Sequence, residues 1–76
     1  MTRSDFKVQR HAATGDSSLA PTSDRARQYV REYRATFGDE ALIGMSIYCE
    51  TSRAPEYLTD TVEELRALGF TVRGVS

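Results

Sequence analysis

Residues 41–75 read ALIGMSIYCETSRAPEYLTDTVEELRALGFTVRGV, and the pattern of this segment predicts a strand, a helix and a second strand. Between positions 41 and 50 apolar residues alternate with mixed ones, which is the period of an extended strand with one buried face. The branched and aromatic residues here also favour a pleated surface. The residues on the predicted apolar face are Ala41, Ile43, Met45, Ile47 and Cys49.

The segment after Pro55 has apolar residues at helical spacing, and Gly69 is a typical residue at the end of a helix. Asp60, with Glu63 three residues later, fits a variant capping box that would start the regular helix as late as Asp60. Residues 70–75 then read as a second strand. Because a strand, a helix and a strand joined by short connections form a right-handed crossover, we expect the two strands to be parallel. The residues predicted on the buried side of the helix are Leu58, Val62, Leu65 and Leu68, with Tyr57 and Thr61 beside them.

Residues 1–40 add one strand and one helix to this unit. Residues 1–4 are polar and are expected to fray, and the alternation over residues 5–10 predicts a short strand. Residues 11–22 show no periodicity and predict a long loop. Thr22 or Ser23 can cap a helix that continues to Phe37. The predicted apolar face of that helix carries Ala26, Tyr29, Val30, Tyr33 and Phe37.

The predicted fold class is α+β, a small two-layer sandwich formed by a single domain over residues 1–76. The elements follow the order β-α-β-α-β, and the crossover occupies residues 41–75. Because the central strand alternates, both helices are expected on one face of a three-stranded sheet.

The composition describes a small domain of balanced charge. With 76 residues the chain is near the lower size limit for one core, and its single cysteine excludes an internal disulfide. The net charge of −1 favours neither nucleic acid nor an acidic partner. No apolar run reaches the length of a membrane span, so we expect a cytoplasmic protein with no membrane contact. The basic residues are nearly all arginine, which suggests a GC-rich bacterium, or its phage acting in the host cytoplasm.

Cys49 and His11 are the first side chains to test for chemistry. A catalytic cysteine needs a base and an electropositive setting, whereas Cys49 falls on the predicted apolar face of its strand. We therefore interpret Cys49 as a buried structural thiol. His11 has no second histidine and no nearby cysteine, so we interpret it as a solvated loop residue. The sequence predicts no catalytic residue, no metal site and no cofactor.

Thr51, Ser52 and Arg53 lie where the central strand ends and the second helix is expected to begin. Ligands bind at this edge of open α/β sheets, and free N–H groups at a helix start attract anions. These residues are a candidate anion-binding site with Arg53 as the clamp. Ordinary helix capping is the favoured interpretation, because the segment lacks a glycine-rich loop and lies between Glu50 and Glu56.

Charges are sorted by sign onto the two predicted helices. Three arginines on the first helix, and three carboxylates on the second, recur at the spacing i, i+4, i+7. Two solvated faces are the simplest interpretation, because exposed ion pairs are individually weak. Complementary stripes could also join helices within a monomer or between monomers, or meet a foreign partner. The arginine stripe is Arg27, Arg31 and Arg34, and the acidic stripe is Glu56, Asp60 and Glu63.

These features favour a small, non-enzymatic protein-binding module. It would be a bacterial or phage accessory factor, a regulator or inhibitor, that binds a larger macromolecule and self-associates as a homodimer or larger homo-oligomer. The first alternative is a nucleic-acid-binding protein that uses the arginine stripe on phosphates, which the balanced net charge disfavours. The second is an enzyme subunit whose anion site at residues 51–53 another chain completes.

Overall fold

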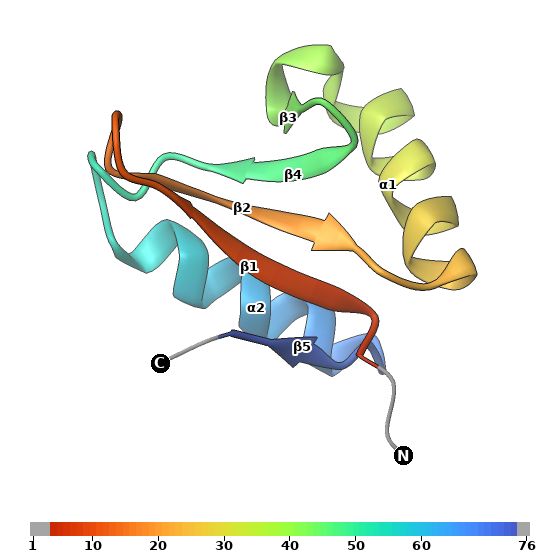
Figure 1. Cartoon of the computed structure of the whole chain (residues 1–76). Helices are drawn as coiled ribbons and strands as arrows, with labels where there is room; N and C mark the ends of the chain where they lie inside the picture. The colour runs from red at the N-terminus through yellow and green to blue at the C-terminus, as the bar shows by residue number, and fades with distance from the viewer. Residues whose placement is uncertain (1–3, 75–76) are drawn as a thin grey trace.

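The computed structural model describes residues 4–74 (Figure 1). The predicted fraying of the N-terminus falls, for residues 1–3, outside the described residues, as does Val75 of the predicted last strand. Ser4 is described, and its carbonyl accepts a hydrogen bond of 2.6 Å from the Thr22 hydroxyl.

Within residues 4–74, five strands and two α-helices form a small α+β structure, which confirms the predicted α+β class. The described sheet has the order β3-β4-β2-β1-β5 and is mixed, because only β1 and β5 among its strands pair in parallel. The predicted three-stranded sheet and its β-α-β-α-β order are therefore wrong. The elements are β1 (Phe6–His11), β2 (Asp16–Pro21), α1 (Asp24–Phe37), the short 3-10 helix η1 (Asp39–Ala41), β3 (Leu42–Ile43), β4 (Ser46–Cys49), α2 (Glu56–Ala67) and β5 (Val72–Arg73).

Strand β2 lies within residues 11–22, where the sequence predicts only a loop. It pairs with β1 along its whole length, from Asp16 opposite His11 to Pro21 opposite Phe6. Gly15, with φ of 76°, is in the left-handed region that the tight connection requires. The strand shows no apolar alternation because its buried positions include Ser17 and Ser18, each 1 % exposed. The extended conformation of β2 therefore depends on its pairing with β1 and is not indicated by its own hydrophobic pattern.

The single strand predicted for residues 41–50 is a hairpin of β3 and β4. Gly44, with φ of 60°, is the first central residue of the turn, in the manner of a type II′ hairpin. The turn places Ile43 and Met45 in solvent, at 45 % and 50 % exposure. Only Ile47 and Cys49 of the predicted apolar face are buried. Apolar and mixed residues alternate through the turn as well, so this pattern does not indicate that the chain reverses direction at Gly44 and Met45.

Helix α2 buries Leu58, Val62 and Leu65 as predicted, but its ends differ from the prediction. It begins at Glu56, directly after Pro55, so Asp60 lies inside the helix and does not cap it. Leu68 follows the last helical residue and is 55 % exposed. Strand β5 pairs with β1 and not with β4. The strands flanking α2 still run in the same direction, with β2 and β1 between them.

Helix α1 matches its prediction closely. The Ser23 hydroxyl caps it by accepting a hydrogen bond of 3.2 Å from the Ala26 N–H. Gly38, with φ of 85°, ends it. Ala26 and Val30 are buried, and Tyr29 and Tyr33 pack at the margin of the core. Phe37, predicted on the same apolar face, is 62 % exposed because it lies at the end of the helix, beyond the core. In Figure 1, α1 rises beside the end of β2 toward β3, and α2 runs below β4 and β2, partly behind β1 and β5, from the end of β4 to β5.

One hydrophobic cluster joins both helices to a single face of the sheet. Val8, Leu19 and Ile47 are neighbours on three adjacent strands and supply its centre. Phe6 makes edge-to-face contact with Tyr29 of α1 and with Phe70 before β5. No helix within residues 4–74 is long and apolar enough to cross a membrane.

Candidate functional site

Two buried aspartates hold the two ends of the β1–β2 hairpin. Asp5 directly precedes β1, Asp16 begins β2, and each is 5 % exposed. A buried carboxylate is costly unless hydrogen bonds compensate for the lost water. Both carboxylates accept several such bonds from residues far away in the chain.

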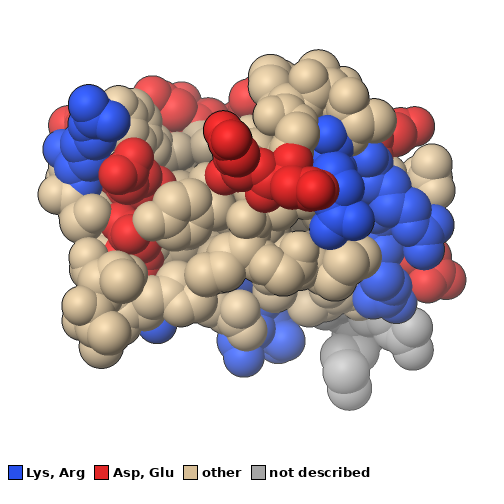
Figure 2. Space-filling model, turned by 90° about the horizontal axis from the view of Figure 1, so that it is seen from above, with Lys and Arg blue, Asp and Glu red and all other residues tan. Residues whose placement is uncertain are grey.

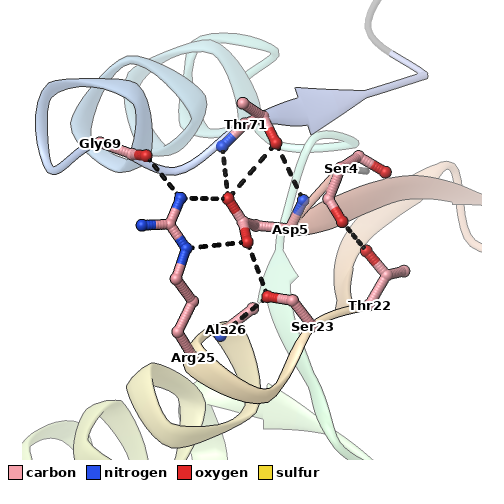
Figure 3. A network of polar contacts seen from close by, with 8 residues as sticks. All are labelled: Ser4, Asp5, Thr22, Ser23, Arg25, Ala26, Gly69 and Thr71. Carbon is pink, nitrogen blue, oxygen red and sulfur yellow. Dashed lines mark hydrogen bonds and ion pairs between the residues drawn. The ribbon is translucent and has the colours of Figure 1, made fainter. Parts of the chain in front are cut away.

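Asp5 joins the start of β1 to the start of α1 and to the segment before β5 (Figure 3). The Arg25 guanidinium donates to it through two nitrogens, at 3.0 and 2.6 Å. The Ser23 hydroxyl donates at 2.7 Å and the Thr71 N–H at 2.9 Å. The bond from Arg25 has the largest effect on Asp5, and the pKa of this carboxyl is held well below its usual range. Asp5 is thus a structural anchor.

Asp16 joins the tip of the first hairpin to the segment after β4. One carboxylate oxygen accepts from the Tyr48 hydroxyl, and the other accepts from Ser52 through its hydroxyl and its N–H. Thr51 strengthens the junction by donating its hydroxyl to the Gly15 carbonyl at 2.9 Å. The hydrogen bonds from Ser52 and then Tyr48 lower the pKa of Asp16. The contact with Asp16 also raises the pKa of Tyr48 to about 12.

The structure places the predicted anion site, residues 51–53, in this junction. The Ser52 N–H and hydroxyl already bind an anion of the chain itself, the Asp16 carboxylate. Arg53 extends into solvent with a side chain 74 % exposed and lies 3.9 Å from Glu50. Because α2 begins only at Glu56, the segment is a turn that closes over Asp16. Binding of an external anion there stays a prediction.

Cys49 and His11 are both engaged inside the fold. Cys49 is 3 % exposed, as predicted for a structural thiol, and its burial raises the pKa of the thiol. His11 is not in a loop, because it is the last residue of β1. Its Nε2 lies 3.0 Å from the hydroxyl of Ser18, which is 1 % exposed. A serine so deeply buried is out of reach of a substrate, so this pair supports the sheet.

The arginine stripe lies along α1, and carboxylates compensate two of its members. Arg27 contacts Asp24 at 3.1 Å, and Arg34 contacts Asp39 at 3.1 Å. Arg34 also donates to the Gly44 carbonyl at 3.3 Å, which ties α1 to the β3–β4 turn. Figure 2 shows Lys and Arg side chains gathered on the right, where α1 lies in Figure 1, next to acidic side chains.

The acidic stripe is exposed along α2. Within residues 4–74 no ion pair includes any of its members, and none joins it to the arginine stripe. The fold therefore does not pair the two stripes with each other. The internal pairing that the sequence left open is absent from the described residues.

An open hollow of about 380 Å³ adjoins the acidic stripe. Three segments border it: the chain before β3, the end of β4 and the first half of α2. No group of three or more histidine, cysteine or acidic residues in the described part of the chain is placed to hold a metal ion. The residues around the hollow, which we call the β4 hollow, are Glu40, Ala41, Tyr48, Cys49, Glu50, Tyr57, Asp60 and Thr61.

Sequence reasoning missed Asp5, Asp16 and the β4 hollow. An aspartate beside a strand is common, and the partners of these two carboxylates lie between 18 and 66 residues further along the chain. Comparison with known proteins adds no further site: no family model matches the chain, and no curated protein or solved structure matches it either.

Proposed function

We propose that this protein is a small, non-enzymatic interaction module that binds a basic surface of a larger protein through the acidic stripe of α2. The observation that carries the proposal is a difference in charge compensation between the two helices. Arg27 and Arg34 each have a carboxylate at 3.1 Å, whereas no ion pair within residues 4–74 involves the acidic stripe. Within residues 4–74 the acidic stripe is therefore a row of three carboxylates without ion-pair partners, whereas Arg31 is the one member of the arginine stripe without such a partner.

The packing of α2 supports this role. Its opposite side is fixed in the core by Leu58, Val62 and Leu65, so the helix presents its carboxylates on a rigid support. A row of like charges over about two helical turns attracts a basic partner over a distance and fixes its orientation.

The reactive side chains support a role without catalysis. The Cys49 thiol is buried with a raised pKa, and the hydroxyl next to His11 belongs to a buried serine. The Asp16 carboxylate is occupied by donors from Tyr48 and Ser52. Each group would first have to leave its present contacts to act as acid, base or nucleophile.

The test is capture of partners from a lysate of the cells that express the protein, followed by affinity measurements with the purified partner. One variant converts each carboxylate of the acidic stripe to its amide. The matched control converts each residue of the arginine stripe to glutamine, which removes the same number of charges from the other helix. We expect the first variant to weaken binding by about tenfold or more and the control to leave it nearly unchanged.

Salt gives an independent reading of the same complex. Binding that depends on the acidic stripe should weaken as ionic strength rises, because exposed charges are screened. A partner lost only from the arginine-stripe variant, or a nucleic acid captured in place of a protein, would contradict the proposal.

A further inference from the structure

The outer edge of β4 is open at its carboxyl end. β3 pairs only with Ser46 and Ile47. Within the described sheet, Tyr48 and Cys49 have strand partners on the β2 side alone. The chain before β3 turns aside into η1, so no strand continues the ladder there. A strand edge without a partner is a template on which another chain can pair.

We propose that this open edge binds an extended, arginine-bearing segment of the partner protein, which adds to the sheet beside β4 and places one arginine side chain in the β4 hollow. The inference rests on the proposed function and names the segment and the site that the partner uses. In this mode of recognition main-chain hydrogen bonds supply affinity, and pockets beside the edge select the side chains.

The position of the hollow relative to the edge supports strand addition. Tyr48 and Cys49 are the last two residues of β4, the chain turns at Glu50 directly after them, and all three residues border the hollow. A segment that pairs with the outer edge at the end of β4 would lie over the hollow. Because side chains alternate across a strand, every second residue of the added segment would point to the same side.

Charge decides which side chain fits. Glu40, Glu50 and Asp60 reach the hollow from three different segments. Among the ion pairs of residues 4–74 only one involves these carboxylates, Glu50 with Arg53 at 3.9 Å. Both of those side chains are largely exposed, at 48 % and 74 %, so the pair contributes little. The hollow therefore has excess negative charge that a cationic side chain complements.

The two tyrosines select arginine over lysine. Tyr48 is oriented by the bond from its hydroxyl to Asp16, and Tyr57, which also lines the hollow, is 45 % exposed. A planar guanidinium can stack on an aromatic ring and bind a carboxylate through two nitrogens, which an ammonium group does less well. The volume of about 380 Å³ is near the lower end of the range of about 300–1,000 Å³ for ligand sites, which suits one long side chain.

The test is an NMR titration of the full chain with a short peptide in which arginine and threonine alternate. We expect the amide signals of Tyr48, Cys49 and Glu50 to shift, together with those of Tyr57 and Thr61. The same peptide with citrulline in place of arginine keeps the shape but not the charge. A second control peptide carries N-methyl groups on alternate backbone nitrogens, which blocks pairing with a strand edge.

Paired variants locate the binding site on the protein. Glu50→Gln with Asp60→Asn removes two charges from the hollow, and Glu56→Gln with Glu63→Gln removes two from α2 outside it. Because all four side chains are exposed, both variants should fold. We expect the first pair to weaken peptide binding about tenfold and the second to weaken it by less than about threefold.

Each outcome bears on the inference. Equal binding of the arginine and citrulline peptides, or of the N-methylated peptide, overturns it. Shifts confined to the acidic stripe outside the hollow overturn it as well, while the proposed function stands. Absence of any shift at low salt also overturns the inference. The proposed function is then tested separately, by the capture of a partner through the acidic stripe.

Discussion

Ser52 and Asp16 form a two-point contact in which the N–H and the hydroxyl of Ser52 both donate to the same carboxylate oxygen, across a separation of 36 residues. This contact fastens the tip of the β1–β2 hairpin to the end of β4. The other oxygen of Asp16 accepts from Tyr48, a residue that also lines the β4 hollow. The same carboxylate therefore holds the sheet together and sets the shape of the proposed binding edge.

Asp16→Asn should destabilise the protein, because the amide can accept at one oxygen only and its NH₂ group then faces donors. We expect a fall of several degrees in the melting temperature, measured by circular dichroism. Asp24→Asn is the matched control, since Asp24 is fully exposed and makes only an exposed ion pair with Arg27. An Asp16→Asn protein that melts with the wild type would show that the junction is dispensable.

Tyr48 should make the protein sensitive to alkali. Its pKa is raised from 10.0 to about 12 in the fold, so the folded state favours the neutral phenol. This contribution is complete below pH 10 and is lost as the pH rises from 10 toward 12. Burial raises the pKa of Tyr29 and Tyr33 in the same direction. Denaturant unfolding at several alkaline pH values should therefore show that the unfolding free energy of Tyr48→Phe falls less steeply with pH than that of the wild type. Some fall should remain, because Tyr29 and Tyr33 are unchanged.

Asp5 should make the protein sensitive to acid. Its pKa is lowered from the ordinary value of 3.8, so its contribution to stability is complete above that pH and is lost as the pH falls below it. Asp5→Asn should reduce the unfolding free energy at neutral pH by about 1–3 kcal/mol, because buried donors lose a charged acceptor. It should also flatten the loss of stability in acid. Asp60→Asn, on the exposed surface of α2, should leave the unfolding free energy at neutral pH nearly unchanged.

Leu65 and Leu68 test the placement of α2. Leu65 is 1 % exposed and Leu68 is 55 % exposed, although both were predicted on the buried side of the helix. Leu65→Ala should cost about 2–5 kcal/mol of unfolding free energy, which is a large share for a domain of this size. Leu68→Ala should change it by less than about 0.5 kcal/mol. Equal effects of the two substitutions in chemical denaturation would mean that the helix is rotated from the position described.

The two charge stripes test self-association. Reversing the arginine stripe to glutamate should reduce the mass in solution if stripes of different copies pair, and reversing the acidic stripe to lysine as well should restore it. Within one copy no ion pair of residues 4–74 joins the stripes, so neither reversal should change the melting temperature through such a contact. Light scattering of the two single reversals and the double reversal makes the comparison. Equal masses in all of them would exclude pairing of the stripes between copies.

The helices were the most predictable part of this molecule. Helical spacing, Ser23 as a cap and Gly38 as a terminator placed α1 from Asp24 to Phe37, and the apolar spacing identified Leu58, Val62 and Leu65 as core residues. These properties depend on residues three or four positions apart, so the chain specifies them locally. The capping-box pattern of Asp60 and Glu63 predicted a start as late as Asp60, whereas α2 begins at Glu56.

The sequence by itself determined the α+β class, both helices and the burial of Cys49, because each follows from neighbouring residues. Only the tertiary structure decided β2, the β3–β4 hairpin and the pairing of β5 with β1. A strand with the sequence DSSLAP is stable because β1 supplies hydrogen-bond partners and both helices cover its neighbours. Asp5 and Asp16 acquired their roles in the same way. Their donors lie up to 66 residues away, and no local pattern records a contact between segments that meet only when the chain has folded.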